Sequence, residues 1–348
     1  MSIKTVAVCE AQVPFVKGGA ESLVKALVNQ LRLHGYAAES VSIPFTWDPK
    51  EELLAHAAAW RLINLHQSNG RPIDLVITTK FPTYFVRHHN KVAWLLHQYR
   101  AAYELCGTIY SDFQHTEEDV GLRQSLIDLD KRMLGECKHL YTIAKNTADR
   151  LKRFNALDAN TLYHPPLLAD RLRSGRQENY ILSVSRLETV KRIDLLIKAL
   201  KFVDEPMDLI IVGEGTQREA LETLAEEQDV HNRVNFLGQI NDQKLVDLYA
   251  DALAIGYVPY DEDYGYVTLE AFLARKPVIT ASDSGGTLEF VQDDINGRIC
   301  HPDAEAIGLA INSLKANHTH ADSLGAAGFE QARDITWDGV IEKLVSNS

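Results

Sequence analysis

Short apolar runs alternate with amphipathic stretches along the first half of the chain. Residues 5–9 form a compact apolar run, and apolar residues recur at helical spacing from Leu23 until the His-Gly-Tyr break at 34–36. The pattern then predicts a strand, a helix and two further strands at residues 39–43, about 49–66, 74–79 and 91–97. Strands and helices that alternate in this way are typical of a doubly wound parallel sheet, an α/β fold.

The alternation resumes in the second half after an irregular segment. Residues 165–178 have mixed charge and no apolar periodicity, and an apolar strand begins at Tyr180. We interpret the irregular segment as an interdomain linker. The sequence therefore predicts one domain over 1–164, a second over 179–334, and an amphipathic helix within 335–348.

Glycine loops follow several of the predicted strands. Gly18-Gly19 stands between the first strand and the first helix, where doubly wound sheets bind phosphates or sugars, although a plain turn is an equal alternative. The loop is not a dinucleotide fingerprint, because G-x-G-x-x-G is absent. Arg186 and Lys191 stand before a helix, where cations are unfavourable for the helix dipole unless an anion such as a pyrophosphate lies between them. We expect the neighbouring Arg192 to be a solvated charge.

The segment 259–286 carries two carboxylates, Glu262 and Glu270, eight positions apart. Gly265 opens a helix between them, and the free amides of a helix N-terminus suit phosphate. Two glutamates would repel a phosphate, so we expect them to accept hydrogen bonds from neighbouring sugar or ribose hydroxyls. The alternative is an ordinary helix with a solvated acid near each end.

The string EDYGYVTLEA, followed by PVI and a Gly-Gly turn, resembles the E-x7-E signature of retaining glycosyltransferases of family 4. One position departs from the pattern, since many members have glycine where this chain has Arg275. The resemblance implies the GT-B fold, two Rossmann-like parallel-sheet domains facing across a cleft, with a terminal helix that crosses back onto the first domain. It covers nearly the whole chain.

The resemblance also implies roles for individual residues. Catalysis is expected to depend on Glu262, Arg186, Lys191 and His97. Donor and nucleotide binding is expected to involve Gly18, Gly19, Gly213, Gly215, Leu237, Tyr264, Gly265, Tyr266, Val267, Thr268 and Glu270. In the family the acceptor is held by the first domain, so the long aperiodic connection after His97 is the candidate acceptor surface, with Tyr99, Arg100 and Tyr103.

Composition restricts the partners. The 48 acidic residues exceed the 36 Lys and Arg and give a formal charge of −12, which argues against nucleic acid. Four scattered cysteines indicate reduced thiols, and no apolar run reaches the roughly 20 residues of a membrane span. We expect a cytoplasmic protein, with peripheral membrane contact at most, through basic residues of the helix near 146–154. Neither a D-x-D motif nor a metal cluster is evident, and the histidine pairs at 88–89 and 318/320 are expected to face solvent.

The sequence therefore predicts a metal-independent, cofactor-free retaining glycosyltransferase. Its substrate would be a nucleotide-diphosphate hexose or deoxyhexose (a UDP-, GDP- or dTDP-sugar), and its acceptor a glycan or lipid-linked glycan in cell-surface polysaccharide synthesis. Three alternatives remain open: a nucleotide-sugar epimerase or hydrolase, a phosphorylase that needs pyridoxal phosphate, and a non-catalytic sugar-nucleotide-binding subunit.

Overall fold

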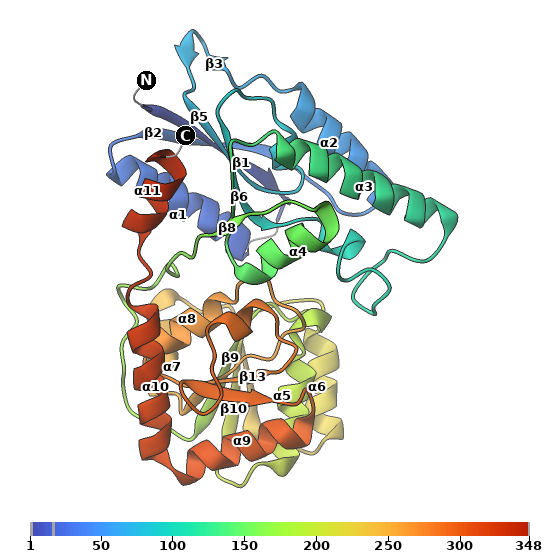
Figure 1. The fold of residues 1–348 in the computed structure, drawn as a ribbon. Coiled ribbons are helices and arrows are strands. Elements are labelled where there is room, and N and C mark those ends of the chain that lie inside the picture. The colour runs from blue at the N-terminus through green and yellow to red at the C-terminus, as the bar shows by residue number, and fades with distance from the viewer. Residues whose placement is uncertain (1–2, 16–17, 347–348) are drawn as a thin grey trace. The chain divides into compact units, whose positions relative to one another are not determined.

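The computed structural model describes residues 3–15 and 18–346 and divides into two compact units. The first unit consists of Met1–Leu167 and Thr336–Ser348, and the second of Leu168–Ile335. Each unit is built on one six-stranded parallel sheet with helices around it (Figure 1). The predicted doubly wound parallel sheets are confirmed in both units.

The sheet of the first unit has the strand order β2-β1-β5-β6-β7-β8. Its strands are β1 (Thr5–Gln12), β2 (Ala37–Pro44), β5 (Leu75–Lys80), β6 (Lys91–His97), β7 (His139–Thr142) and β8 (Asn160–Thr161). The helices are α1 (Gly19–Leu33), α2 (Leu53–Leu62), α3 (Glu117–Gly135), α4 (Lys145–Asn155) and α11 (Trp337–Ser346), with single 3-10 turns at Lys50–Glu52, Thr83–Phe85 and Arg100–Ala102. The central strands β5 and β6 are almost entirely buried, as expected for a parallel sheet covered on both faces.

The helix predicted over about 49–66 ends early, at Leu62. A two-stranded hairpin follows, made of β3 (Gln67–Ser68) and β4 (Arg71–Pro72). Its turn is Asn69-Gly70, with both residues at positive φ, which is the backbone preference of this dipeptide in tight hairpins. The Asn-Gly dipeptide indicates such a hairpin, but the apolar periodicity of the preceding segment predicted a helix that was too long.

The terminal helix α11 belongs to the first unit and packs beside α1 (Figure 1). Its buried face consists of Val340, Ile341, Leu344 and Val345. The ring of Trp337 meets Trp94 edge-on, with the ring centroids 6.1 Å apart. The chain therefore returns to complete the core of its first unit.

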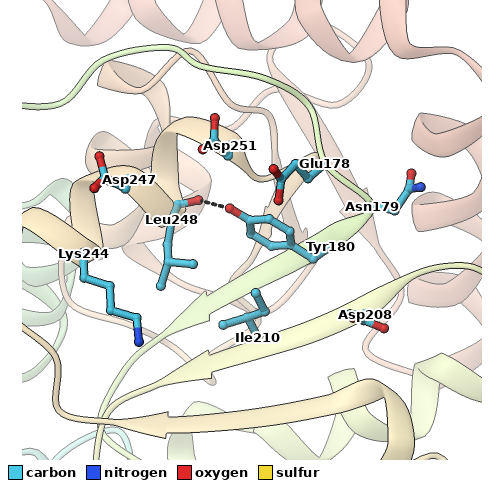
Figure 2. A pocket seen from close by; sticks show the side chains of 9 residues that line it. All are labelled: Glu178, Asn179, Tyr180, Asp208, Ile210, Lys244, Asp247, Leu248 and Asp251. Carbon is cyan, nitrogen blue, oxygen red and sulfur yellow. Dashed lines mark hydrogen bonds between the residues drawn. The ribbon is translucent and has the colours of Figure 1, made fainter.

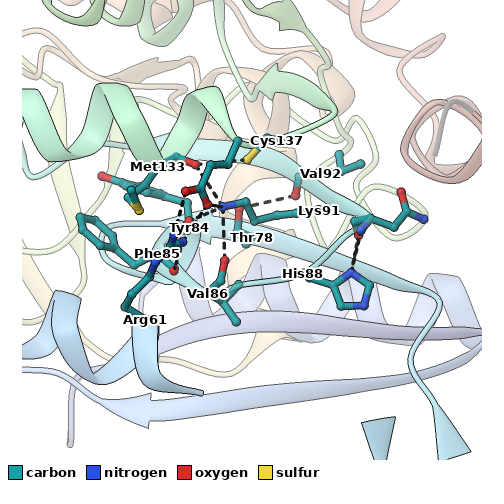
Figure 3. Close-up of polar contacts among 12 residues, drawn as sticks. Arg61, Thr78, Tyr84, Phe85, Val86, His88, Lys91, Val92, Met133 and Cys137 are labelled. Carbon is teal, nitrogen blue, oxygen red and sulfur yellow. Dashed lines mark hydrogen bonds and ion pairs between the residues drawn. The ribbon is translucent and has the colours of Figure 1, made fainter. Parts of the chain in front are cut away.

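A fully buried lysine ties three elements of the first unit together. Lys91 donates from Nζ to the carbonyl oxygens of Tyr84 (2.8 Å), Met133 (3.0 Å) and Val86 (3.3 Å) (Figure 3). Glu136 completes the set at 3.3 Å. Because a buried ammonium needs several acceptors, this arrangement joins the start of β6, the turn at Thr83–Phe85 and the end of α3.

The sheet of the second unit has the strand order β11-β10-β9-β12-β13-β14. Its strands are β9 (Tyr180–Val184), β10 (Asp208–Val212), β11 (Val234–Gly238), β12 (Ala254–Gly256), β13 (Val278–Ala281) and β14 (Gly297–Cys300). The helices are α5 (Ile193–Ala199), α6 (Arg218–Glu227), α7 (Asp242–Asp251), α8 (Tyr266–Leu273), α9 (Ala304–Ala316) and α10 (His318–Ala332), with 3-10 turns at Thr189–Lys191, Leu200–Phe202, His231–Arg233 and Gly286–Glu289. This is the order of a Rossmann sheet, which grows outward in both directions from its first strand.

The segment predicted as a linker is divided between the two units, with its larger part in the second. Arg173 pairs with Asp247 of α7, and the amide of Arg176 donates to Asp251 at 2.8 Å. Lys276, which is buried, donates to the carbonyl of Arg176 at 3.3 Å. Residues 168–178 are thus fixed along the second unit.

Candidate active site

The strand order of the second unit changes direction between β9 and β12. In doubly wound sheets, ligands bind at the carboxyl ends of the strands where the order reverses. Arg186 and Lys191 follow β9 directly, and Glu262 follows β12. The topology therefore brings these three predicted site residues to the same edge of the sheet.

The loop that carries Glu262 is held by the Gly285-Gly286 turn after β13. The amide of Gly286 donates to the carbonyl of Glu262 at 2.6 Å, and the amide of Glu262 donates to Ser284 at 3.3 Å. A Cβ on Gly285 or Gly286 would lie 2.6 Å or 2.2 Å from backbone atoms of this loop. Both glycines are therefore required by close backbone packing, which fixes the backbone of Glu262.

Arg192 is the cation that organises this region, contrary to the expectation that it is solvated. Its guanidinium pairs with both carboxylate oxygens of Asp283, at 2.9 and 2.6 Å, and donates to the carbonyls of Val258 and Pro259, both at 2.8 Å. The side chain of Arg192 is only 11% exposed. It links the loop after β9 to the two segments that position Glu262.

Lys191 and Glu262 form an ion pair with each other. The ammonium of Lys191 donates to Oε2 of Glu262, and the same oxygen accepts from the hydroxyl of Tyr257 at 3.0 Å. Burial and the adjacent Glu262 carboxylate raise the pKa of Tyr257 well above its usual value, so the phenol remains a donor. Lys191, which is predicted to bind phosphate, and Glu262, which is predicted to bind the sugar, are therefore direct neighbours.

Glu270 lies on α8 and is partly exposed. Its Oε2 accepts from the hydroxyl of Tyr249 at 2.7 Å. Burial raises the pKa of Glu270, and this hydrogen bond opposes the shift. Each glutamate of the E-x7-E pattern thus has its own tyrosine donor.

The start of α8 has the geometry predicted for a close backbone approach. Gly265 has φ +75°, a region that favours glycine, and a Cβ there would lie 2.9 Å from Oγ1 of Thr287. Tyr264, Val267 and Thr268 are buried, and Tyr266 is half-buried. Their side chains pack the helix into the unit, so the first-turn backbone is what this helix can offer to an anion.

Two other residues of the second unit that were predicted to bind the sugar donor are glycines, and close packing explains why glycine stands there. A Cβ on Gly213 would lie 1.8 Å from the carbonyl oxygen of Ser185, and one on Gly215 would lie 2.4 Å from that of Leu187. These glycines let the loops after β9 and β10 touch. Arg186 is exposed beside them, and Leu237 is half-buried at the end of β11.

In the first unit, Gly18-Gly19 opens α1 as predicted. The amide of Gly18 donates to Oε2 of Glu21 at 2.9 Å, and the other oxygen of Glu21 pairs with Lys80 at 3.0 Å. Lys80 ends β5, the strand next to β1. This ion pair, which sequence patterns did not reveal, fixes the glycine loop at the carboxyl edge of the sheet. The ion pair lowers the pKa of Glu21 against the opposing effect of burial.

His97 lies at the end of β6, where its Nδ1 is 2.6 Å from the carbonyl of Gln98. Since a carbonyl only accepts, Nδ1 carries the proton of this hydrogen bond. Of the predicted acceptor residues, Tyr99 is half-buried and Arg100 pairs with Glu104. Tyr103 is buried in the core and donates to Asp130 at 2.6 Å, which argues against its predicted contact with an acceptor.

Of the histidine pair at 88–89, His89 is exposed as expected, whereas His88 is not. His88 is buried, with its ring nitrogens 2.8 Å from the carbonyl of Asn90 and 3.0 Å from that of Ile73. His66, His88 and His89 are close enough to be considered as ligands of one metal ion. Because the backbone contacts both nitrogens of His88, this cluster lacks a third accessible ligand.

Among the basic residues of α4, Lys145, Lys152 and Arg153 are exposed, as on a solvated helix face, whereas Arg150 is not. Arg150 is buried and pairs with Glu104 at 2.9 Å, and Lys152 pairs with Asp158 at 2.6 Å. Across residues 3–15 and 18–346, no helix combines the length and the apolar character that a bilayer crossing requires.

A pocket of about 440 Å³ lies in the second unit, away from the predicted site. It is lined by Tyr180 and Asp208, which begin β9 and β10, and by residues of α7 (Figure 2). The hydroxyl of Tyr180 donates across it to Leu248 at 2.7 Å. The pocket is therefore at the amino ends of these strands, opposite the edge that carries Lys191 and Glu262.

Comparison with known proteins shows what the second unit and the fold resemble. Residues 168–331, nearly all of the second unit, match the family described as glycosyl transferases group 1. Sucrose-phosphate synthase from Thermosynechococcus elongatus has a similar structure, with a TM-score of 0.75 and 19% identity over 99% of this chain and 100% of that one. Anabaena HepE in complex with UDP and glucose gives a TM-score of 0.70 and 16% identity over 98% and 100%. The chain thus shares its fold with these two solved structures over nearly its whole length.

Curated relatives match part of the chain. An uncharacterized glycosyltransferase of Methanocaldococcus jannaschii is 36% identical over 173 residues, 49% of this chain and 44% of that protein. The human alpha-1,3/1,6-mannosyltransferase ALG2 is 27% identical over 186 residues, covering 49% and 44%. The O-antigen chain mannosyltransferase RfbU of Salmonella typhimurium is 27% identical over 155 residues, covering 43% and 44%. The matches span less than half the length of these relatives.

Proposed function

We propose that the protein is a retaining glycosyltransferase that moves a sugar from a nucleotide-diphosphate donor to an acceptor hydroxyl. The observation that carries the proposal is the carboxyl edge of the second sheet, where Lys191 pairs with Glu262 and where α8, the helix that carries Glu270, follows β12. A cation, a helix N-terminus and two hydrogen-bond-accepting carboxylates match a diphosphate, a sugar and a ribose. The family match over the same unit supports this interpretation.

Each residue has a distinct proposed task. Arg186 and Lys191 neutralise the diphosphate, and the first-turn amides of α8 stabilise the charge that develops on the leaving group. Glu262 accepts from sugar hydroxyls and Glu270 from the ribose. Glu262 pairs with Lys191, so a diphosphate would compete with the carboxylate for the ammonium.

In the first unit, Gly18, Gly19 and His97 are proposed to contact the sugar. The Glu21–Lys80 pair fixes the glycine loop, and the hydrogen bond from Nδ1 to the carbonyl of Gln98 orients the ring of His97. Tyr99 and Arg100 remain the proposed acceptor residues.

The donor is proposed to be a UDP-, GDP- or dTDP-linked hexose or deoxyhexose, and the acceptor a glycan or lipid-linked glycan of the cell surface. The names of ALG2 and RfbU favour a mannose-type sugar. Thermal-shift screening against these nucleotide sugars, followed by product analysis with and without acceptor, tests the proposal. A stabilising donor that is turned over only in the presence of acceptor is expected. A donor that is isomerised or hydrolysed equally well without acceptor would contradict transfer.

The transfer is further proposed to need no divalent metal, because Arg186, Lys191 and the α8 amides supply the positive charge that a metal supplies elsewhere. Turnover should therefore persist in excess EDTA. Complete loss of turnover with EDTA, restored by magnesium or manganese, would show that this charge is insufficient.

A further inference from the structure

The hydroxyl of Tyr249 serves one carboxylate oxygen of Glu270. Tyr249 lies near the end of α7, is fully buried, and donates to Oε2 of Glu270 across the gap between α7 and α8 at 2.7 Å. Among residues 3–15 and 18–346, no donor contacts the other oxygen, Oε1. One oxygen is therefore fixed by the protein, and the other is left for a ligand.

A carboxylate that must recognise a ribose needs a fixed orientation. The side chain of a free glutamate has three rotatable bonds, and their immobilisation costs conformational free energy each time a ligand binds. A buried phenol that holds one carboxylate oxygen removes much of that cost in advance. Because Tyr249 is fully buried, its own position is set by packing.

We propose that Tyr249 is a positioning residue for donor recognition, which orients Glu270 so that Oε1 accepts from the ribose hydroxyls. This inference rests on the proposed function, in which Glu270 contacts the ribose. The electrostatics agree with the geometry. Burial raises the pKa of Tyr249 well above its usual value and keeps the phenol a donor, and burial also raises the pKa of Glu270, a shift that the hydrogen bond from Tyr249 opposes.

The test compares ribose discrimination in two variants. The probes are UDP and GDP, each with its 2′,3′-dideoxy analogue, and binding is measured by calorimetry. Tyr249→Phe should weaken ribonucleotide binding about five- to tenfold, the usual effect of one lost hydrogen bond to a charged group, and should change dideoxynucleotide binding less than twofold. Glu270→Gln should also reduce the preference for the ribonucleotide. In steady-state assays, Tyr249→Phe should raise the donor KM and leave kcat within about twofold.

Tyr180→Phe is the matched control. Tyr180 is also buried, and its hydroxyl donates to the carbonyl of Leu248, the residue before Tyr249 on the same helix. This variant loses a similar hydrogen bond to α7 without touching Glu270, so its ribose preference should equal that of the wild type.

The outcomes separate the inference from the proposed function. Tyr249 has no positioning role if Tyr249→Phe leaves the preference for the ribonucleotide over its dideoxy analogue unchanged while Glu270→Gln reduces that preference. This holds whether Tyr249→Phe weakens the binding of both probes equally or changes the binding of neither. If Glu270→Gln leaves ribose preference unchanged, the proposed ribose contact is wrong and the inference is overturned with it. If neither UDP nor GDP binds the wild type, the inference and the proposed function are both contradicted for ribonucleotide donors.

Discussion

Arg192 makes a bidentate ion pair with Asp283, 91 positions later in the chain. Arg192 has a left-handed backbone, with φ +51°, and directly follows Lys191. Asp283 directly precedes Ser284 and the glycine turn that holds Glu262. One ion pair therefore keeps Lys191 and Glu262, the residues proposed to contact phosphate and sugar, in register with each other.

Replacing Arg192 by Met should lower the free energy of unfolding by about 2–4 kcal/mol, because it leaves Asp283 and two carbonyls without their donor. It should also raise the donor KM, since Glu262 loses its support. Urea denaturation and steady-state kinetics measure the two effects. The control is Arg171→Met, which removes an exposed ion pair with Asp242 and should change stability by less than about 0.5 kcal/mol. Equal stability of the two variants would contradict the role of Arg192.

Replacing Arg186 or Lys191 by Ala should lower kcat/KM, because each change removes a charge-assisted contact with the leaving diphosphate. The expected loss of transition-state stabilisation is roughly 2–4 kcal/mol. The fold should survive, since Arg186 is exposed and Lys191 lies on a single 3-10 turn. Kinetics with saturating acceptor give the measurement, and circular dichroism verifies folding. An unchanged kcat/KM in either variant rules out that residue as a phosphate contact.

The residues of the candidate site that stand in one local string could be proposed from the sequence, whereas the residues held by distant pairs could not. Glu262 and Glu270 stand in one short string, whose flanking residues carry the resemblance. Arg192 and Tyr249 act through partners 91 and 21 positions away, so no local pattern distinguishes them from a solvated arginine and a core tyrosine. Apolar periodicity predicted the strands and helices for the opposite reason, because each helix or strand repeats its pattern within itself.

The structure shows how Arg275 is accommodated at a position where many members of the family have glycine. This residue follows α8 with φ +56°, a backbone region in which glycine is unstrained. Arg275 adopts it all the same, and its guanidinium lies 4.0 Å from the centroid of the Phe329 ring. The sequence shows only that glycine is absent, whereas the structure shows what the arginine gains there.

Replacing Lys91 by Met should lower the free energy of unfolding by about 3–5 kcal/mol, since three carbonyls and Glu136 would lose a buried cation (Figure 3). Lys131→Met, at an exposed position of α3, is the matched control and should be nearly neutral. Urea denaturation of both variants decides the matter. A Lys91→Met protein as stable as Lys131→Met would show that the buried ammonium contributes nothing net.

The stability of the wild type should depend on pH through Asp130. Burial raises the pKa of this carboxyl to about 7, whereas an unfolded aspartate has a pKa near 3.9. Between about pH 4 and about pH 7 the folded state keeps a proton that the unfolded state loses, so the contribution of Asp130 to stability falls as pH rises. Asp130→Asn, which imitates the neutral form, should therefore gain stability relative to the wild type as pH rises from 5 to 7.

Urea denaturation at each pH checks this difference. Asp128→Asn is the control, because Asp128 lies on the same helix and is exposed. Its stability difference from the wild type should not vary with pH in this window. A constant difference for Asp130→Asn would mean that Asp130 is ionised in the folded protein throughout this range.

Gly18 and Gly213 differ in whether the surrounding structure requires a glycine. Gly18 has an extended backbone, with φ −151°, and a Cβ there would make only an ordinary contact, 3.4 Å from Oε2 of Glu21. Gly213 has φ +133°, and a Cβ would lie 1.8 Å from the carbonyl oxygen of Ser185. Neither strain nor packing therefore demands glycine at position 18, although a sugar or phosphate that approaches the backbone would.

The free energy of unfolding of Gly18→Ala should lie within about 0.5 kcal/mol of the wild-type value. The variant should also bind the nucleoside diphosphate normally, because the proposed nucleotide contacts lie in the second unit. Its turnover should fall roughly 10- to 100-fold, as expected when a side chain displaces the reacting sugar. Gly213→Ala should instead lose stability by several kcal/mol, because the loops after β9 and β10 must separate. Urea denaturation, calorimetry and turnover on both variants test the contrast, and wild-type turnover in Gly18→Ala would exclude the glycine loop from the sugar site.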